Sequence, residues 1–113
     1  MKDLVSYSDF TKIEIRLGTI ISAELNNKLQ RPSFILHIDF GNEIGVKKSS
    51  AQLTKNYNVQ KLLHKQIAAV INFPKKQIGG LISEVLVLGF PDSNGEPVLI
   101  VPDKKIVNGG QLY

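Results

Sequence analysis

The alternation of apolar and polar side chains over residues 33–40 is the feature that most constrains what this chain can fold into. The apolar positions are Phe34, Leu36, Ile38 and Phe40. A period of two is typical of a β-strand with one buried face, because successive side chains point to opposite sides of a sheet. Residues 13–21 show the same period, with Gly18 on the opposite face indicating a bend or a bulge. The chain is therefore predicted to be all-β.

Further strands are expected to start at residue 44 and to cover residues 66–73, 82–90 and 98–101. Residues 82–90 are almost all apolar, as in a strand buried on both faces. The alternation stops after Ser50, where the spacing of Leu53, Tyr57 and Leu62 favours a short helix. This order predicts an OB-fold, a five-stranded Greek-key barrel with a short helix between strands 3 and 4 and additional terminal segments. A small β-sandwich is the competing architecture, although it would not need the helical break.

The length of 113 residues predicts one domain, over residues 1–113. The absence of cysteine excludes a disulfide framework, a thiolate nucleophile and a sulfur-ligated zinc site. Ser49, His37 and Asp39 could be combined into a catalytic set, but a solvated polar strand face explains His37 and Asp39 more simply. We therefore expect no enzyme activity, no metal and no cofactor. Residues 1–5 lack the apolar run of a signal peptide, so a cytoplasmic location is expected.

Positive charge is concentrated in one part of the chain. No acidic residue lies between Glu43 and Glu84, and that window carries +7, whereas the rest of the chain carries −3. Such a distribution suggests a face that attracts nucleic acid, an anionic membrane or an acidic peptide, and a set of solvated lysines is the alternative. With twelve lysines and two arginines, contacts to phosphate are favoured over base readout. The lysines in the window are Lys47, Lys48, Lys55, Lys61, Lys65, Lys75 and Lys76.

The loop over residues 72–80 is the segment that says most about function. It joins two apolar strands and contains Lys75, Lys76 and the pair Gly79–Gly80. Glycine lets the backbone approach a phosphate closely, and the two lysines would supply charge. A basic turn that binds no ligand is the alternative interpretation. We predict a flexible, basic loop.

Two motifs resemble the tRNA-binding OB domain that occurs at the carboxyl end of some methionyl-tRNA synthetases. The first is Phe-Thr-Lys-Ile-Glu-Ile-Arg-Leu-Gly-Thr-Ile over residues 10–20, which includes Arg16. The second keeps Asn72, Lys76, Gly80 and Ser83 in the register of the family. One branch of this family, the CsaA proteins, consists of small export-related chaperones. The chain is similar to that branch over residues 38–41, 49–55, 72–74 and 83–89. Val85 and Leu86 stand where the wider family has Gly and Met.

The resemblance implies an ATP-independent chaperone that binds unfolded or precursor polypeptides, acts in protein export and forms a homodimer. The alternative is a tRNA-binding protein or a trans-acting tRNA-binding module. Glu84 would repel phosphate, so tRNA binding is expected to be weak and non-specific, unless Glu84 only pairs with a lysine and fixes the loop. The candidate residues for nucleic-acid or peptide binding are Arg16, Lys47, Asn72, Lys75, Lys76, Gly80, Ser83, Glu84 and Leu86.

A homodimer is also suggested by apolar residues that a five-stranded barrel does not need for its own core. They are Val98 to Val101, Pro102, Ile106, Val107 and Leu112. Apolar surface in excess of the core is typical of interfaces between subunits. This prediction leaves the geometry of the dimer open.

Overall fold

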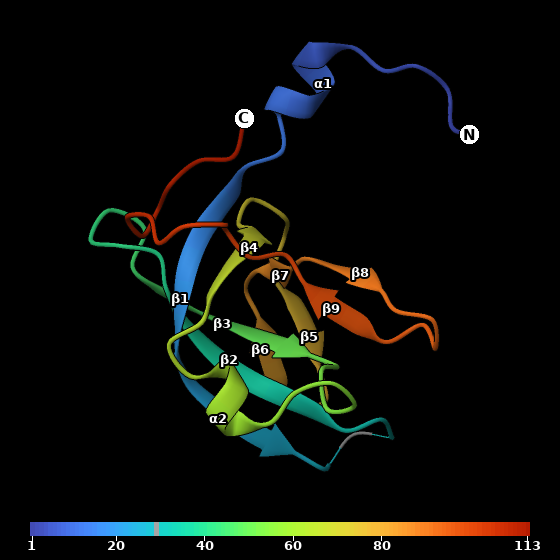
Figure 1. Ribbon diagram of the computed structural model, residues 1–113, viewed down its shortest axis with the longest axis vertical. Coiled ribbons are helices and arrows are strands. Elements are labelled where there is room, and N and C mark those ends of the chain that lie inside the picture. The colour runs from blue at the N-terminus through green and yellow to red at the C-terminus, as the bar shows by residue number, and fades with distance from the viewer. Residues whose placement is uncertain (29) are drawn as a thin grey trace.

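The computed structural model describes residues 1–28 and 30–113. Its centre is a curled antiparallel sheet of five strands in the order β3-β2-β1-β4-β7 (Figure 1). The strands are β1 (Ile15–Asn26), β2 (Ser33–Asp39), β3 (Val46–Ala51), β4 (Gln66–Val70) and β7 (Leu86–Val87). The short helix α2 (Val59–Leu62) lies between β3 and β4 in the chain, as the break in the alternation predicts. The all-β, OB-like fold is thereby confirmed.

Strand β2 supplies the centre of the core. Phe34, Leu36 and Ile38 are buried, while the residues between them are only partly buried. Phe40, directly after the strand, is 1% exposed and completes the predicted face. Leu53 and Leu62 from the helical connection pack into the same cluster. The alternation over residues 33–40 therefore predicts this buried face correctly, because a strand with one solvent-exposed face buries only every second side chain.

Strand β1 departs from its predicted alternation. Ile20 is fully buried on the same face as Gly18, whereas Ile21 is 46% exposed, so the core face of β1 is opposite to the predicted one. The pairing of β1 with β2 shifts register only after this point, between Ile20 and Ser22. Gly18 faces the core, where a Cβ atom would lie 2.5 Å from Cγ2 of Ile38. Leu17 is buried on the other side under the C-terminal segment, since its N–H donates to the carbonyl of Gly110 at 2.9 Å. The glycine thus provides space for the core, and the bulge lies after it.

The apolar run over residues 82–90 is not one strand buried on both faces. It contributes to three short strands: β6 (Leu81–Ser83), β7 and β8 (Gly89–Pro91). Leu86 is 50% exposed and Phe90 is 67% exposed. The chain bends between these strands because each pairs with a different neighbour, β6 with β5, β7 with β4, and β8 with β9 (Pro97–Leu99).

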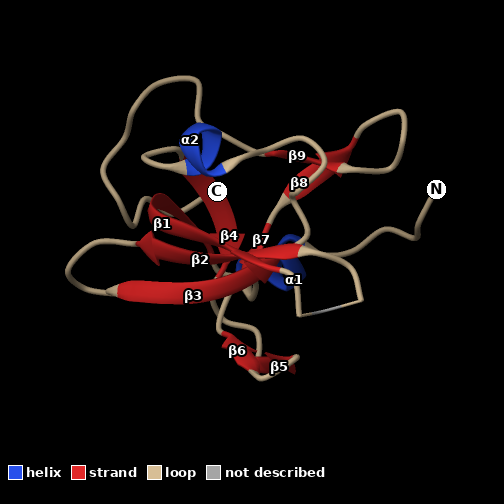
Figure 2. Ribbon diagram, turned by 90° about the horizontal axis from the view of Figure 1, so that it is seen from below, coloured by secondary structure: helices blue, strands red, loops and turns tan. Residues whose placement is uncertain are grey.

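The basic loop is a hairpin rather than a flexible loop. Strand β5 (Lys76–Ile78) pairs with β6 around a two-residue turn. Gly79 and Gly80 have φ of 52° and 82°, and positive φ at both positions is what a type I′ hairpin turn requires. Figure 2 shows this hairpin standing out from one side of the five-stranded sheet. Glycine at this turn is therefore explained by hairpin geometry alone.

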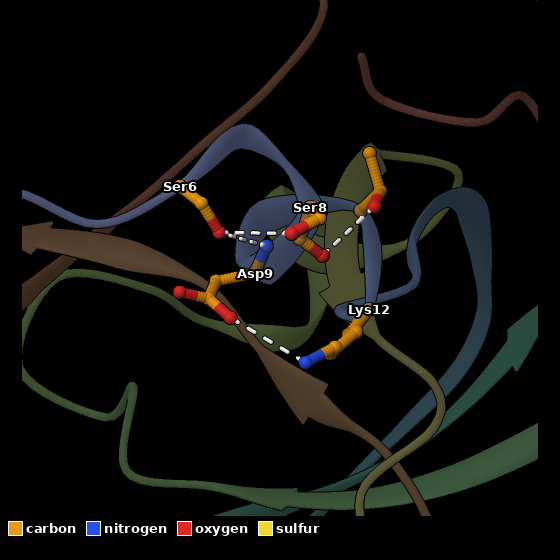
Figure 3. A network of polar contacts seen from close by, with 5 residues as sticks. Ser6, Ser8, Asp9 and Lys12 are labelled. Carbon is orange, nitrogen blue, oxygen red and sulfur yellow. Dashed lines mark hydrogen bonds and ion pairs between the residues drawn. The ribbon is translucent and has the colours of Figure 1, made fainter.

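The N-terminal segment projects from the barrel. Helix α1 (Tyr7–Thr11) buries none of its residues, and Figure 1 shows it standing away from the sheet. Its polar contacts are internal: the Ser6 hydroxyl caps the N–H of Asp9 at 3.2 Å, and Asp9 pairs with Lys12 at 3.4 Å (Figure 3). The segment carries exposed apolar side chains at Met1, Leu4, Val5 and Tyr7.

Candidate functional site

The barrel is closed next to the basic hairpin by one backbone hydrogen bond and two side-chain hydrogen bonds. Strand β3 has β2 on one edge, and on its other edge the N–H of Glu84 donates to the carbonyl of Lys48 at 2.8 Å. Oε1 of Glu84 accepts the N–H of Lys48 at 3.0 Å in return. The hydroxyl of Ser83 accepts the N–H of Ser50 at 3.1 Å. Two polar side chains thus replace part of a strand ladder, and this fixes the base of the hairpin against β3.

Glu84 is a structural anion inside a basic neighbourhood. Its side chain is 19% exposed, and Oε2 lies 3.6 Å from Nζ of Lys75. The hydrogen bond from Lys48 lowers the pKa of Glu84 below its ordinary value, and the charges of Lys75 and Lys47 lower this pKa further, although burial opposes them. The pairing with a lysine that the alternative predicts for this residue is present, and the carboxylate also holds the base of the hairpin through Lys48.

A hollow of about 340 Å³ opens beside this closure. Ser83, which is 8% exposed, lines it, and most of the surface that lines it is apolar. Leu86 and Phe73 border it with half-exposed side chains. The residues that line it are Ser50, Phe73, Pro74, Lys76, Ile78, Ser83, Glu84, Val85 and Leu86. We call it the hairpin pocket.

The hairpin pocket brings together four of the residues predicted from the sequence: Lys76, Ser83, Glu84 and Leu86. Lys75 joins them through its ion pair with Glu84. The positive charge of Lys47 helps to lower the pKa of Glu84. Gly80 sits apart, because it forms the tip of the hairpin and lines a separate hollow with residues of β1 and β2.

Asn72 and Arg16 have contacts of their own away from the pocket. The amide of Asn72 accepts the N–H of Glu14 at 2.8 Å and donates to the carbonyl of Lys12 at 2.7 Å, so it ties the end of β4 to the start of β1. The guanidinium of Arg16 contacts Glu14 at 2.8 Å and the carbonyl of Gly109 at 2.8 Å. Both side chains therefore have structural partners in the barrel.

The predicted site residues include Leu86 of the apolar lining but not Phe73 or Ile78. The sequence predicts a strand over residues 66–73, but β4 ends at Val70 and Phe73 is 48% exposed. Ile78 belongs to the segment that the sequence predicts to be a flexible loop. A usable signal was Pro74, because proline ends a central strand and leaves the residue before it outside the ladder.

The comparisons with known proteins agree with this geometry. A family model described as a putative tRNA-binding domain matches residues 15–111, which is most of the chain. The chain belongs to this tRNA-binding domain family. A domain of this family is not catalytic by itself, although relatives form part of an enzyme.

Two solved members of similar length are chaperones by description. A CsaA chaperone from Bacillus anthracis str. Ames is 42% identical with a TM-score of 0.92, over 98% of this chain and 100% of that chain. A CsaA chaperone from Picrophilus torridus is 44% identical with a TM-score of 0.90, over 97% and 100%. These structural neighbours agree with the CsaA resemblance of the sequence.

Curated members of the family are longer. Methionine–tRNA ligase from Methanococcoides burtonii is 33% identical over 112 residues, which is 99% of this chain and 16% of the ligase. The ligase from Porphyromonas gingivalis (strain ATCC 33277) is 26% identical over 108 residues, 96% of this chain and 15% of the ligase. The chain thus spans about a sixth of the length of these relatives.

Among residues 1–28 and 30–113, no group of three or more His, Cys, Asp or Glu side chains could hold a metal ion. Within the same residues, no helix is long and apolar enough to cross a membrane.

Proposed function

We propose that this chain is an ATP-independent, CsaA-like chaperone that binds unfolded or precursor polypeptides in the cytoplasm and acts in protein export. The observation that carries the proposal is the hairpin pocket, an apolar hollow of about 340 Å³ next to exposed lysines. The likeness to two CsaA chaperones over their whole length supports it. Folded proteins cover their own apolar side chains, so such a hollow distinguishes unfolded chains from folded ones.

The size of the pocket sets what it can hold. Burying one Leu-sized side chain contributes roughly 1.5–3 kcal/mol to the free energy of binding, which corresponds to weak and reversible binding. Weak binding suits a holdase, because the client must leave in order to fold. Lys75 and Lys76 would attract acidic stretches of the client and keep the complex hydrated.

We also propose that the protein acts as a homodimer. Exposed apolar side chains gather in the two terminal segments, among them Val5, Tyr7, Val107 and Leu112. A second hollow of about 210 Å³ lies between β1 and the C-terminal segment, lined by Leu17, Val101 and Ile106 among others. The projecting N-terminal segment of another copy offers apolar side chains of the kind that this hollow would bury.

Suppression of aggregation tests the chaperone proposal. A chemically denatured enzyme is diluted into buffer with or without this protein, and light scattering is followed without nucleotide. We expect wild type to reduce scattering and Leu86→Asp to lose the effect, because the charge would stand at the pocket. Ile21→Asp is the matched control, since Ile21 is 46% and Leu86 50% exposed. Equal activity of both variants, or no activity of wild type, would contradict the proposal.

A tRNA-binding module is the second candidate function, favoured by the family match over residues 15–111. In this role Lys47, Lys75 and Lys76 would meet phosphates. Asn72 and Ser83 would act only by positioning the backbone, because their polar atoms already have partners. Competition between labelled tRNA and a labelled unfolded peptide at two salt concentrations tells the functions apart: salt weakens phosphate contacts far more than apolar ones.

A further inference from the structure

Strand β5 has one paired edge and one open edge. It pairs with β6 in the register Lys76–Ser83, Gln77–Ile82 and Ile78–Leu81, and its sheet contains only these two strands within the described residues. Around a two-residue turn the flanking pair, Ile78–Leu81, is the hydrogen-bonded one, so the next pair, Gln77–Ile82, is not. The N–H and C=O of Gln77 therefore point away from β6, toward the open edge.

The open edge lies beside the hairpin pocket. Lys76 and Ile78 are two positions apart, share one face of β5 and both line the pocket. Phe73 and Leu86, which are 48% and 50% exposed, add apolar surface there. A strand laid against β5 would present every second side chain to this same face. An extended polypeptide could therefore pair with the open edge of β5 and place alternate side chains in the hairpin pocket.

Charge decides which polypeptide fits. Lys75 is 67% exposed, and Lys76 has no carboxylate within 4.0 Å among the residues that the structure describes. The carboxylate of Glu84 is already occupied by Lys48 and Lys75. A second copy of β5 would bring the same lysines together, and like charges on an edge oppose pairing. Acidic side chains on the partner would be attracted instead.

We propose that β5 receives an extended client segment as an added β-strand, whose alternate apolar side chains enter the hairpin pocket and whose acidic side chains, on the opposite face of the strand, meet Lys75. The inference rests on the polypeptide-binding function proposed above and adds the mode of backbone recognition and the sequence class of the client. Main-chain hydrogen bonds supply part of the affinity in such strand addition, and pockets for alternate side chains supply specificity.

The first test changes the protein. Gln77→Pro removes the outward N–H, while the β5–β6 ladder keeps its bonds because proline is tolerated on an edge. Gln77→Ala keeps the N–H and is the matched control. The probe is a fluorescent ten-residue peptide of alternating Leu and Glu. We expect Gln77→Pro to weaken its binding about tenfold, as for one or two lost hydrogen bonds, and Gln77→Ala to leave it unchanged. A cooperative thermal unfolding transition for each variant would verify that both variants are folded.

The second test changes the peptide and needs no variant. One isomer is N-methylated at every Leu and the other at every Glu, so each loses its N–H donors along one edge only. An added strand turns one edge to β5 and the other to water. We therefore expect one isomer to lose binding about tenfold and the other to bind like the parent peptide.

The outcomes separate this inference from the function on which it rests. Equal binding of both isomers together with wild-type binding by Gln77→Pro overturns strand addition, while suppression of aggregation by wild type would still support the chaperone. Loss of binding by both isomers also overturns it, because only one edge can face β5. If wild type binds neither the parent peptide nor a denatured enzyme, both proposals fail. A peptide of alternating Leu and Lys that binds as well as the acidic one overturns the sequence class.

Discussion

Lys48 of β3 and Glu84, two residues before β7, are joined by reciprocal hydrogen bonds of 2.8 Å and 3.0 Å, one through the backbone and one through the carboxylate of Glu84. This pair joins the two ends of the curled sheet. It also places Lys75 over the same carboxylate and fixes the hairpin pocket beside it. One acidic residue thus links closure of the barrel to the candidate binding surface.

Removal of the Glu84 carboxylate is expected to destabilise the fold. In Glu84→Ala the N–H of Lys48 loses its acceptor, and a hydrogen bond to a charged group is worth about 1.5–3 kcal/mol. Glu84→Gln keeps an oxygen in place of Oε1 and should lose less. Chemical denaturation of the three proteins measures this. Equal free energies of unfolding for wild type and Glu84→Ala would show that the closure does not depend on this residue.

The lowered pKa of Glu84 predicts a loss of stability in acid. Because the pKa is lower in the folded state, its stabilising contribution is present above the ordinary carboxyl value of 4.5 and is lost as the pH falls through the folded-state pKa. The pKa of Asp92 is lowered too, mainly by the hydrogen bond from the side-chain amide of Asn56. The acid sensitivity of wild type therefore contains contributions from both carboxylates, and a Glu84 variant is needed to separate them. Denaturation curves of wild type and Glu84→Gln between pH 7 and pH 3 should converge on acidification. Parallel curves would contradict the assignment.

Neutralising Glu84 should tighten tRNA binding modestly. Its charge lies beside Lys75 and within the field of Lys47, where it would oppose a phosphate. Glu84→Gln is expected to gain something like 0.3–1 kcal/mol at low salt, the usual range for one partly exposed charge. A random RNA of equal length should gain as much, since no base readout is involved. Tight wild-type binding with a strong preference for folded tRNA would make tRNA binding the primary function.

The hairpin lysines should carry the salt dependence of any RNA binding. Lys75→Glu with Lys76→Glu is expected to flatten the slope of log affinity against log salt by roughly one to two units, because two phosphate contacts are lost. Lys104→Glu with Lys105→Glu is the matched control, with the same change in net charge on exposed residues distant in the sequence. The same slope for both double variants would place the RNA elsewhere.

Sedimentation at micromolar concentration tests the homodimer. We expect a species of twice the 12.5 kDa chain mass, and Val107→Asp should shift it toward the monomer, because Val107 is 84% exposed in one chain and a buried charge would oppose association. Glu43→Ala, on the loop between β2 and β3, should leave the mass unchanged. A 12.5 kDa species alone would rule out the dimer.

The sequence by itself determined those parts of the fold that depend on local periodicity. The alternation of Phe34, Leu36 and Ile38 fixes which face of β2 is buried, since the pleat of a strand sends every second side chain inward. The loss of alternation after Ser50 gives the position of α2. Lys76 and Ser83, which the sequence singles out by charge and motif, both line the hairpin pocket.

Tertiary structure decided what depends on contacts between segments distant in the chain. Gly18 reads as a bend in the sequence, yet its role comes from Ile38 and Phe40, which occupy the space of its missing side chain. The run over residues 82–90 looks like one buried strand, but three different partners divide it. Glu84 reads as a charge that repels phosphate, while Lys48, 36 positions earlier, makes it a closing residue of the barrel. Such contacts leave no periodic signal, because they are set by how the sheet curls and not by neighbours in the chain.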